Sequence, residues 1–159
     1  MSKESLKKKI LEAQNRADIA ALYVLENEAH ELFDEDTLHA YYANILDLAL
    51  ENLTDTLESH RTMDMNEVKD FATLRALYEY AMEHYSVGKA DDAAALFEVL
   101  SGLSNDKKFS DAMKLHQVAA SQGLSLDDFL DTIADLQATQ EASSFYINHF
   151  TKKAQEILA

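Results

Sequence analysis

The amino-acid sequence predicts an all-α protein, and three observations support this fold class. Proline is absent and glycine occurs only three times in 159 residues, whereas the turns between strands are rich in both. Alanine and leucine, which are strong helix formers, are abundant throughout. Apolar residues recur at spacings of three and four, as they do on a helix with one buried face. We therefore expect about seven helices, packed as antiparallel hairpins within one domain, residues 1–159.

Residues 1–63 are expected to form two long N-terminal helices. The first runs from near Ser5 to Leu32 or Phe33, and a break near Asn15 is left open. A carboxylate in the next three residues, Asp34 to Asp36, can cap a new helix by accepting its free backbone N–H groups. The second helix spans about Thr37 to His60. Its expected buried stripe consists of Leu38, Tyr42, Ile45, Ala49, Leu53 and Leu57.

Residues 64–159 are expected to form hairpins followed by a C-terminal helix. The segment 64–67, Asp-Met-Asn-Glu, resembles a capping box and opens a third helix that ends near Gly88. A fourth helix spans about Ala90 to Ser101, with Gly102 as a left-handed stop. Ser104 caps a fifth helix, which runs to Gln122.

The last two expected helices are less clearly marked at their ends. The sixth opens at Ser125 and runs to about Leu136. Its expected buried face consists of Leu126, Phe129, Leu130, Ile133 and Leu136. The seventh spans about Glu141 to Leu158.

The segment from Leu77 to Leu100 predicts a tight helical hairpin. Small residues at Ala81 and Ala93 allow two antiparallel helices to approach closely, and Phe97 fills the space beyond them. Gly88 suits the turn because a positive φ costs glycine nothing. The hairpin residues Leu77, Tyr80, Ala81, Gly88, Ala93, Phe97 and Leu100 resemble a tetratricopeptide repeat, a helix–turn–helix unit of about 34 residues.

With Tyr78, Tyr85, Lys89, Asp92, Leu103, Asp106 and Phe109 added, the segment is similar to the first repeat of type III secretion translocator chaperones. Leucine stands where many repeats have tryptophan, Ala81 where many have glycine, and Asn105 where proline often closes the unit. A second hairpin is expected from about Ala112 to Leu136, although Phe129 falls where the first hairpin has the small Ala93. The fold is therefore expected to be tetratricopeptide-like or an irregular helical bundle.

The resemblance implies a groove on the other stripe of the third helix that holds a peptide or a partner helix. Its partner-binding residues would be Arg75, Tyr78, Met82, Tyr85, Met113 and Gln117. The alternative is that Tyr78 and Tyr85 belong to the core. Aromatic and methionine side chains suit peptide binding because they offer adaptable apolar surface.

The charge of the chain restricts its partners. The formal net charge is −15, and residues 26–59 contain ten carboxylates without a lysine or arginine. Such a surface repels nucleic acid and anionic membranes, so we expect a protein or peptide partner, with a basic partner as one alternative. The absence of cysteine, signal peptide and apolar span favours a cytoplasmic protein.

The sequence contains no recognisable catalytic motif, so we expect a non-enzymatic adaptor or chaperone without a cofactor. Histidines lie one helical turn from carboxylates at Glu26–His30–Asp34, Glu35–His39 and His60–Asp64. A metal-binding helical bundle, as a store or an enzyme, is therefore one alternative, although Glu-x-x-His does not occur and no metal residue is assigned. A homo-oligomer that pairs its first two helices is the other.

Overall fold

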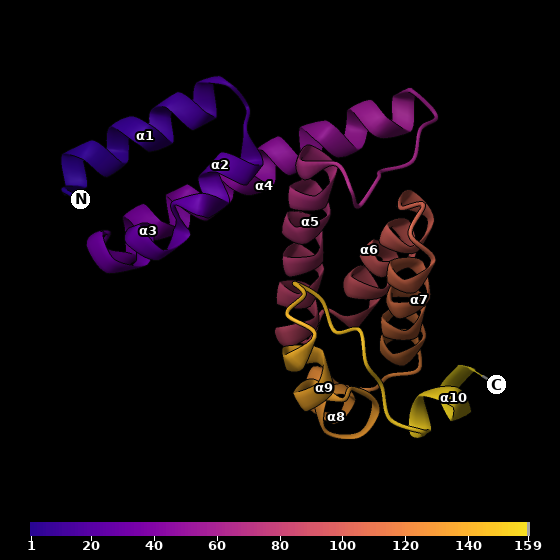
Figure 1. Cartoon of the computed structure of the whole chain (residues 1–159). Helices are drawn as coiled ribbons and strands as arrows, with labels where there is room; N and C mark the ends of the chain where they lie inside the picture. Colours follow the sequence, from indigo (N-terminus) through magenta and orange to yellow (C-terminus); the bar gives the residue numbers. More distant parts are fainter. Residues whose placement is uncertain (159) are drawn as a thin grey trace.

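Two parts of the chain meet at helix α5 (Val68–Ser86): an N-terminal arm, helices α1 to α4, and a C-terminal body built on α5, α6 and α7 (Figure 1). The structure, a computed structural model, describes residues 1–158. These residues form ten α-helices and one π-helical turn without a strand, which confirms the all-α prediction and exceeds the expected count of seven. The domain's predicted last residue, 159, lies outside the described residues. None of the helices in residues 1–158 is long and apolar enough to cross a bilayer.

The arm contains three short helices where one long helix was expected: α1 (Lys3–Asn15), α2 (Ile19–Val24) and α3 (Glu26–Leu32). The break near Asn15 is present because Ala17 takes a φ of 52° and Asp18 accepts the N–H of Ala21. A second break at Leu25 was not expected. The three helices contribute Leu6, Ile10, Ala13, Ile19, Leu22 and Ala29 to the hydrophobic core of the protein.

Helix α4 (Glu35–Glu58), the last helix of the arm, is the longest in the chain and leads into the body. Asp34 caps it as predicted, accepting the N–H of Thr37 at 2.8 Å. Ile45 and Ala49 are buried as expected, but Leu57 is 54% exposed, so its place in the buried stripe was wrong. The buried face lies slightly to one side of the predicted stripe and includes Tyr41 and Thr56.

The predicted hairpin is present as α5 and α6 (Ala90–Leu103). Gly88 makes the turn with a φ of 84°, and Ala81, Ala93 and Phe97 are all fully buried. A bridge between Met63 and Ser104 places the end of α6 beside the start of α5, so the two helices are antiparallel. Helix α6 continues through Gly102, which therefore does not stop it.

Helix α7 (Lys107–Ser121) packs closely against α6, and the second expected hairpin is incomplete. Asp106, and not Ser104, caps α7 by accepting the N–H of Phe109 at 2.9 Å. Beyond Gly123, Ser125 caps as predicted. However, the return helix is only α8 (Leu126–Asp128) and the π-helical turn η1 (Phe129–Ile133).

The prediction of a long helix ending near Leu136 was wrong, because the chain becomes extended at Ala134. Leu136 is 47% exposed and starts a separate helix, α9 (Leu136–Glu141). The buried Phe129 occupies the position that corresponds to Ala93 in the first hairpin. A large side chain at this position accompanies the loss of the tight two-helix contact.

The expected C-terminal helix from Glu141 to Leu158 is also wrong, since only α10 (Lys153–Leu158) is helical beyond α9. The intervening segment crosses the body with its backbone groups bonded to other elements. The N–H of Ile147 donates to the hydroxyl of Tyr78, and the N–H of Thr151 donates to the carbonyl of Ile133. Tyr146 and Ile147 are buried within this non-helical segment.

Candidate functional site

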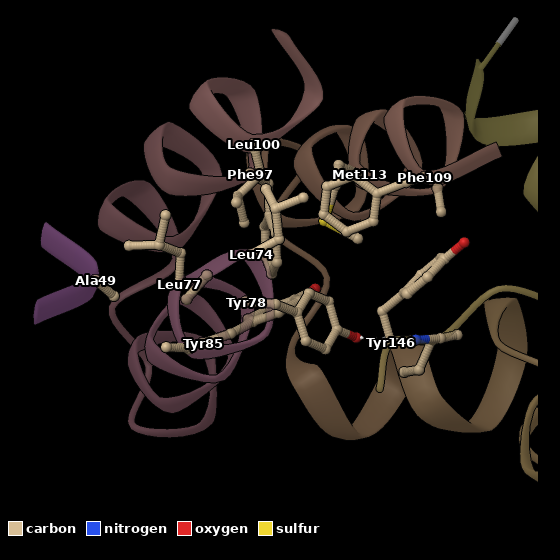
Figure 2. Close-up of a cluster of buried hydrophobic side chains, with 14 of the residues drawn as sticks. Ala49, Leu74, Leu77, Tyr78, Tyr85, Phe97, Leu100, Phe109, Met113 and Tyr146 are labelled. Atoms are coloured by element: carbon tan, nitrogen blue, oxygen red, sulfur yellow. Dashed lines mark hydrogen bonds between the residues drawn. The ribbon is translucent and has the colours of Figure 1, made fainter. Parts of the chain in front are cut away.

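The predicted peptide groove is occupied by the protein's own core. Tyr78, Tyr85 and Met113 are 4%, 2% and 0% exposed, so their assignment as partner-binding residues is corrected: they cannot contact a partner in this structure. Figure 2 shows Tyr78 and Tyr85 within the cluster that also holds Phe97 and Met113. Arg75, Met82 and Gln117 are partly exposed.

This face is buried by the chain beyond α7, not by the arm. The ring of Tyr78 contacts those of Phe145 and Tyr146 at centroid distances of 6.0 and 6.4 Å. Its hydroxyl accepts the N–H of Ile147 at 3.2 Å and bonds Nε2 of His116 at 2.9 Å. The Tyr85 hydroxyl donates to the carbonyl of Leu124 at 2.7 Å. Burial raises the pKa of Tyr78, and it raises the pKa of Tyr85 to about 12.

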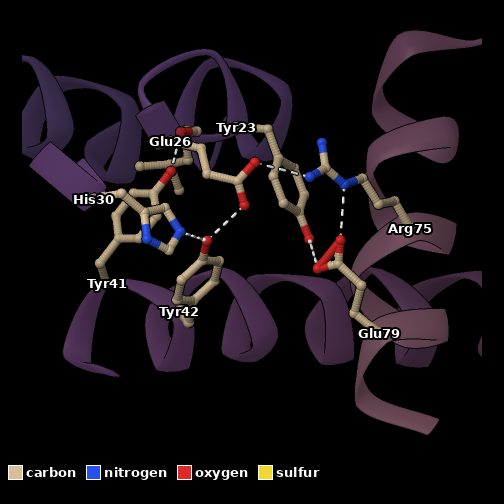
Figure 3. Close-up of polar contacts among 8 residues, drawn as sticks. Tyr23, Glu26, His30, Tyr41, Tyr42, Arg75 and Glu79 are labelled. Atoms are coloured by element: carbon tan, nitrogen blue, oxygen red, sulfur yellow. Dashed lines mark hydrogen bonds and ion pairs between the residues drawn. The ribbon is translucent and has the colours of Figure 1, made fainter. Parts of the chain in front are cut away.

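A second cluster of polar side chains lies where the arm meets α5 (Figure 3). Arg75 donates from Nε to Glu79 at 2.8 Å and from an η nitrogen to Glu26 at 2.9 Å. Its guanidinium lies 3.8 Å from the ring centroid of Tyr23, a cation–π contact. The Tyr23 hydroxyl donates to Glu79 at 3.3 Å. Arg75 therefore ties α2 and α3 to α5, and we call Tyr23, Glu26, Arg75 and Glu79 the arm joint.

The arm joint continues through Glu26 onto α4. The Tyr42 hydroxyl donates to the Glu26 carboxylate and also bonds Nε2 of His30 at 2.7 Å. The hydroxyl of Tyr41 donates to the carbonyl of Leu22. Burial raises the pKa of Tyr42, and the hydrogen bond to Glu26 raises it further. Both tyrosines therefore stay protonated and serve as donors that hold α2 and α3 against α4.

The arm joint forms one wall of a cavity in the corner between α2, α4 and α5. The cavity has a volume of about 430 Å³. Its lining consists of Tyr23, His39, Tyr42, Ala43, Ile45, Leu46, Ala76, Glu79, Tyr80 and Glu83. Most of the lining surface is apolar. Tyr23 of the arm joint and Tyr42 on α4 are among the lining residues. Concave sites of this size with an apolar floor and few polar groups are typical of ligand recognition.

The charged side chains that line the cavity itself are both carboxylates. Glu79 and Glu83 are the charged residues of the lining, which includes neither lysine nor arginine. Glu79 already accepts hydrogen bonds from Arg75 and Tyr23, whereas Glu83 is exposed on α5 one turn further along. The cavity therefore offers an apolar floor beside a carboxylate that a cationic group can reach.

In the first histidine–carboxylate group noted in the sequence, Glu26 and His30 enter other contacts. Glu26 is engaged by Arg75 and Tyr42, and His30 by Tyr42. Within residues 1–158, no three His, Asp or Glu side chains lie close enough to share a metal ion.

Sequence reasoning singled out Arg75 of the arm joint, but it missed the cavity beside the joint and the residues that line this cavity. Tyr23 and Glu79 are far apart in the sequence from their partners, and no local pattern links them. One signal was available on α4. Ala43, Leu46 and Leu50 lie outside the predicted buried stripe although they continue at helical spacing, which indicates a second apolar face on that helix.

Comparison of the chain with known protein families, with curated proteins and with solved structures finds no significant match.

Proposed function

We propose that this chain is a non-enzymatic protein-interaction module, an adaptor or chaperone, whose binding site is the corner cavity between α2, α4 and α5. The observation that supports this function most strongly is the cavity itself, with its mainly apolar lining and a carboxylate edge formed by Glu79 and Glu83. A segment of a partner protein that carries both apolar and basic side chains satisfies both features. The net charge of −15 draws such a segment toward the protein over a distance of about a Debye length.

A labelled peptide of about 15 residues, built from leucine and lysine, provides a probe whose binding can be followed by fluorescence anisotropy. We expect a dissociation constant on the order of micromolar in moderate salt. Ala43→Trp places an indole into the cavity from an exposed position and should weaken binding about tenfold or more. Ala40→Trp is the matched control, since Ala40 is exposed on the same helix outside the cavity lining.

An oligolysine peptide of equal length separates the site from general attraction to an acidic protein. Equal affinity for oligolysine, or equal loss of affinity in the Ala40→Trp and Ala43→Trp variants, would contradict the proposed site.

A further inference from the structure

Helix α4 carries a second apolar stripe whose spacing is that of a coiled-coil seam. Its members are His39, Ala43, Leu46, Leu50, Leu53 and Leu57, separated alternately by four and three residues. This alternation is the a and d pattern of a heptad repeat, maintained here over more than two heptads. We call these six residues the α4 seam.

The α4 seam is distinct from the buried face of the same helix. Tyr41, Ile45 and Ala49 point into the core at 3%, 2% and 0% exposure. In the seam, Leu50 and Leu57 are 36% and 54% exposed, His39 and Ala43 are exposed, and Leu46 and Leu53 are half-buried. A leucine stripe left open to solvent at regular spacing is typical of a surface that another helix covers.

The seam leads directly into the corner cavity. His39, Ala43 and Leu46 line the cavity, whereas Leu50 lies in a shallow depression further along α4 with Asp47, Glu51, Thr54 and Asp55. The seam and the cavity therefore form one continuous apolar track along α4, with α5 bordering its first half.

Charge on α4 identifies the sign of the occupant. Asp47 lies at an e position, which flanks a partner helix, and Asp47, Glu51 and Asp55 form the acidic lining of the depression around Leu50. Residues 26–59 contain no lysine or arginine, so two copies of α4 brought together would face acid with acid. Flanking charges set the partner in coiled coils, and like charges disfavour pairing. A second copy of this chain is therefore a poor occupant, and a basic helix is a good one.

We infer that the partner of this module is a basic amphipathic helix, which lays leucine-like residues at heptad a and d positions along the α4 seam and enters the corner cavity at one end. This inference rests on the proposed function and specifies the conformation and chemistry of its partner. A flanking lysine or arginine of the partner helix pairs with Asp47, the acidic depression around Leu50 attracts the others, and the cavity end places another basic side chain near Glu83.

A 21-residue peptide with leucine at every a and d position and lysine at every e and g position tests this inference. We expect it to bind and to gain helicity on binding, as followed by anisotropy and circular dichroism. The double variant Leu50→Gln/Leu57→Gln should weaken binding about tenfold or more. The matched control is Leu11→Gln/Val99→Gln, which alters two other exposed apolar side chains, 56% and 41% exposed, on α1 and α6.

A peptide of the same composition, with leucines moved out of heptad register, should bind at least about tenfold more weakly. Equal binding of this scrambled peptide would overturn the inference. Loss of binding in Ala43→Trp without any effect of Leu50→Gln/Leu57→Gln would leave the proposed cavity function standing and overturn the helix seam. No effect of either variant would contradict both. Sedimentation that shows a dimer of the wild type and a monomer of Leu50→Gln/Leu57→Gln would identify a second copy as the occupant and overturn the basic-partner inference.

Discussion

The arm and the body differ in the kinds of contact that stabilise them. The body encloses aromatic rings from α5, α6, α7 and the C-terminal segment, among them Tyr78, Phe97, Phe109 and Tyr146 (Figure 2). The arm contributes mostly aliphatic side chains to the same core, and the arm joint adds charged contacts between α2, α3 and α5. Burial of apolar surface stabilises the body whatever the ionic conditions, whereas the arm joint is sensitive to charge.

Polar groups show the same contrast. Within residues 1–158, the two buried side-chain oxygens without a hydrogen-bond partner belong to Glu28 and Asn44, both in the arm. In the body, His116 is fully buried with both ring nitrogens bonded, to Tyr78 and to the carbonyl of Ala112. Buried polar groups are thus more completely hydrogen-bonded in the body than in the arm, and the candidate site lies where the two parts meet.

Removing one aromatic side chain from the body should produce the largest loss of stability. Phe97 is fully buried, with an exposed fraction of 0%, and it contacts the rings of Tyr78, Tyr85 and His116. We expect Phe97→Ala to lower the free energy of unfolding by about 3–5 kcal/mol, measured by urea denaturation. Val99→Ala, at an exposed position of the same helix, should change it by less than about 0.5 kcal/mol. Similar effects of the two variants would contradict the aromatic core.

Acid should destabilise the body through His116. Burial lowers the pKa of His116 from 6.5 to about 4, and only the neutral ring can accept the hydrogen bond from Tyr78. Between these values the unfolded chain binds a proton that the folded chain does not. The contribution is therefore complete above about pH 6.5 and lost as pH falls to about 4, amounting to about 3 kcal/mol.

Urea denaturation of wild type and His116→Gln at several pH values measures this effect. The variant loses the titrating group but keeps every carboxylate, so the stability difference between the two proteins should shrink as pH falls from 7 to 4. Parallel stability curves would show that His116 does not titrate in this way.

Replacing Arg75 in the arm joint should lower the free energy of unfolding by less than the loss of Phe97 does. Hydrogen bonds to both Glu26 and Glu79 raise the pKa of this half-buried guanidinium, although burial by itself lowers it. Arg75→Met keeps the aliphatic stem but removes the charged donor from both carboxylates, which retain the hydroxyls of Tyr23 and Tyr42 as donors. We expect a loss of about 1–3 kcal/mol, together with faster amide hydrogen exchange in α2 and α3 and unchanged exchange in α6.

The exposed pair of Lys107 and Asp111 provides the control for Arg75. Its side chains are 87% and 63% exposed at an N–O distance of 2.6 Å. Lys107→Met should therefore cost no more than about 0.5 kcal/mol. Equal effects of Lys107→Met and Arg75→Met would mean that the arm joint is no stronger than a surface ion pair.

The same contrast explains how far the sequence predicts the structure. In the body, small residues at Ala81 and Ala93 with Gly88 between them are a local pattern, and the α5–α6 hairpin follows it. The arm joint depends on contacts between Tyr23, Arg75 and Glu79 that no sequence spacing announces. On α4, helical periodicity identifies apolar positions but cannot separate the buried face from the seam, so Leu57 was assigned to the wrong one.

The C-terminal segment escaped prediction for a related reason. Its helical composition suggested a helix from Glu141 to Leu158, yet its backbone is bonded to distant groups such as the hydroxyl of Tyr78. Burial of Tyr146 against Phe109, at a ring distance of 5.0 Å, outweighs local helix propensity. The same segment covers Tyr78, one of the residues that the tetratricopeptide resemblance placed in a groove.

The smallest predicted effect concerns the turns. The hairpin turns of the body place glycine at positive φ, at Gly88 with 84° and Gly123 with 85°, whereas the turn between α1 and α2 places Ala17 at 52°. A left-handed conformation costs a residue with a Cβ about 1–2 kcal/mol, and glycine avoids this cost while losing about 0.5–1 kcal/mol more entropy on folding. Ala17→Gly should therefore stabilise the protein by about 0.5 kcal/mol, visible as slower amide exchange in α1. Ala40→Gly, in the interior of α4, should instead destabilise by about 1 kcal/mol. If both glycine variants destabilise alike, the α1–α2 turn is not strained, and the arm differs from the body in its polar joint but not in its turns.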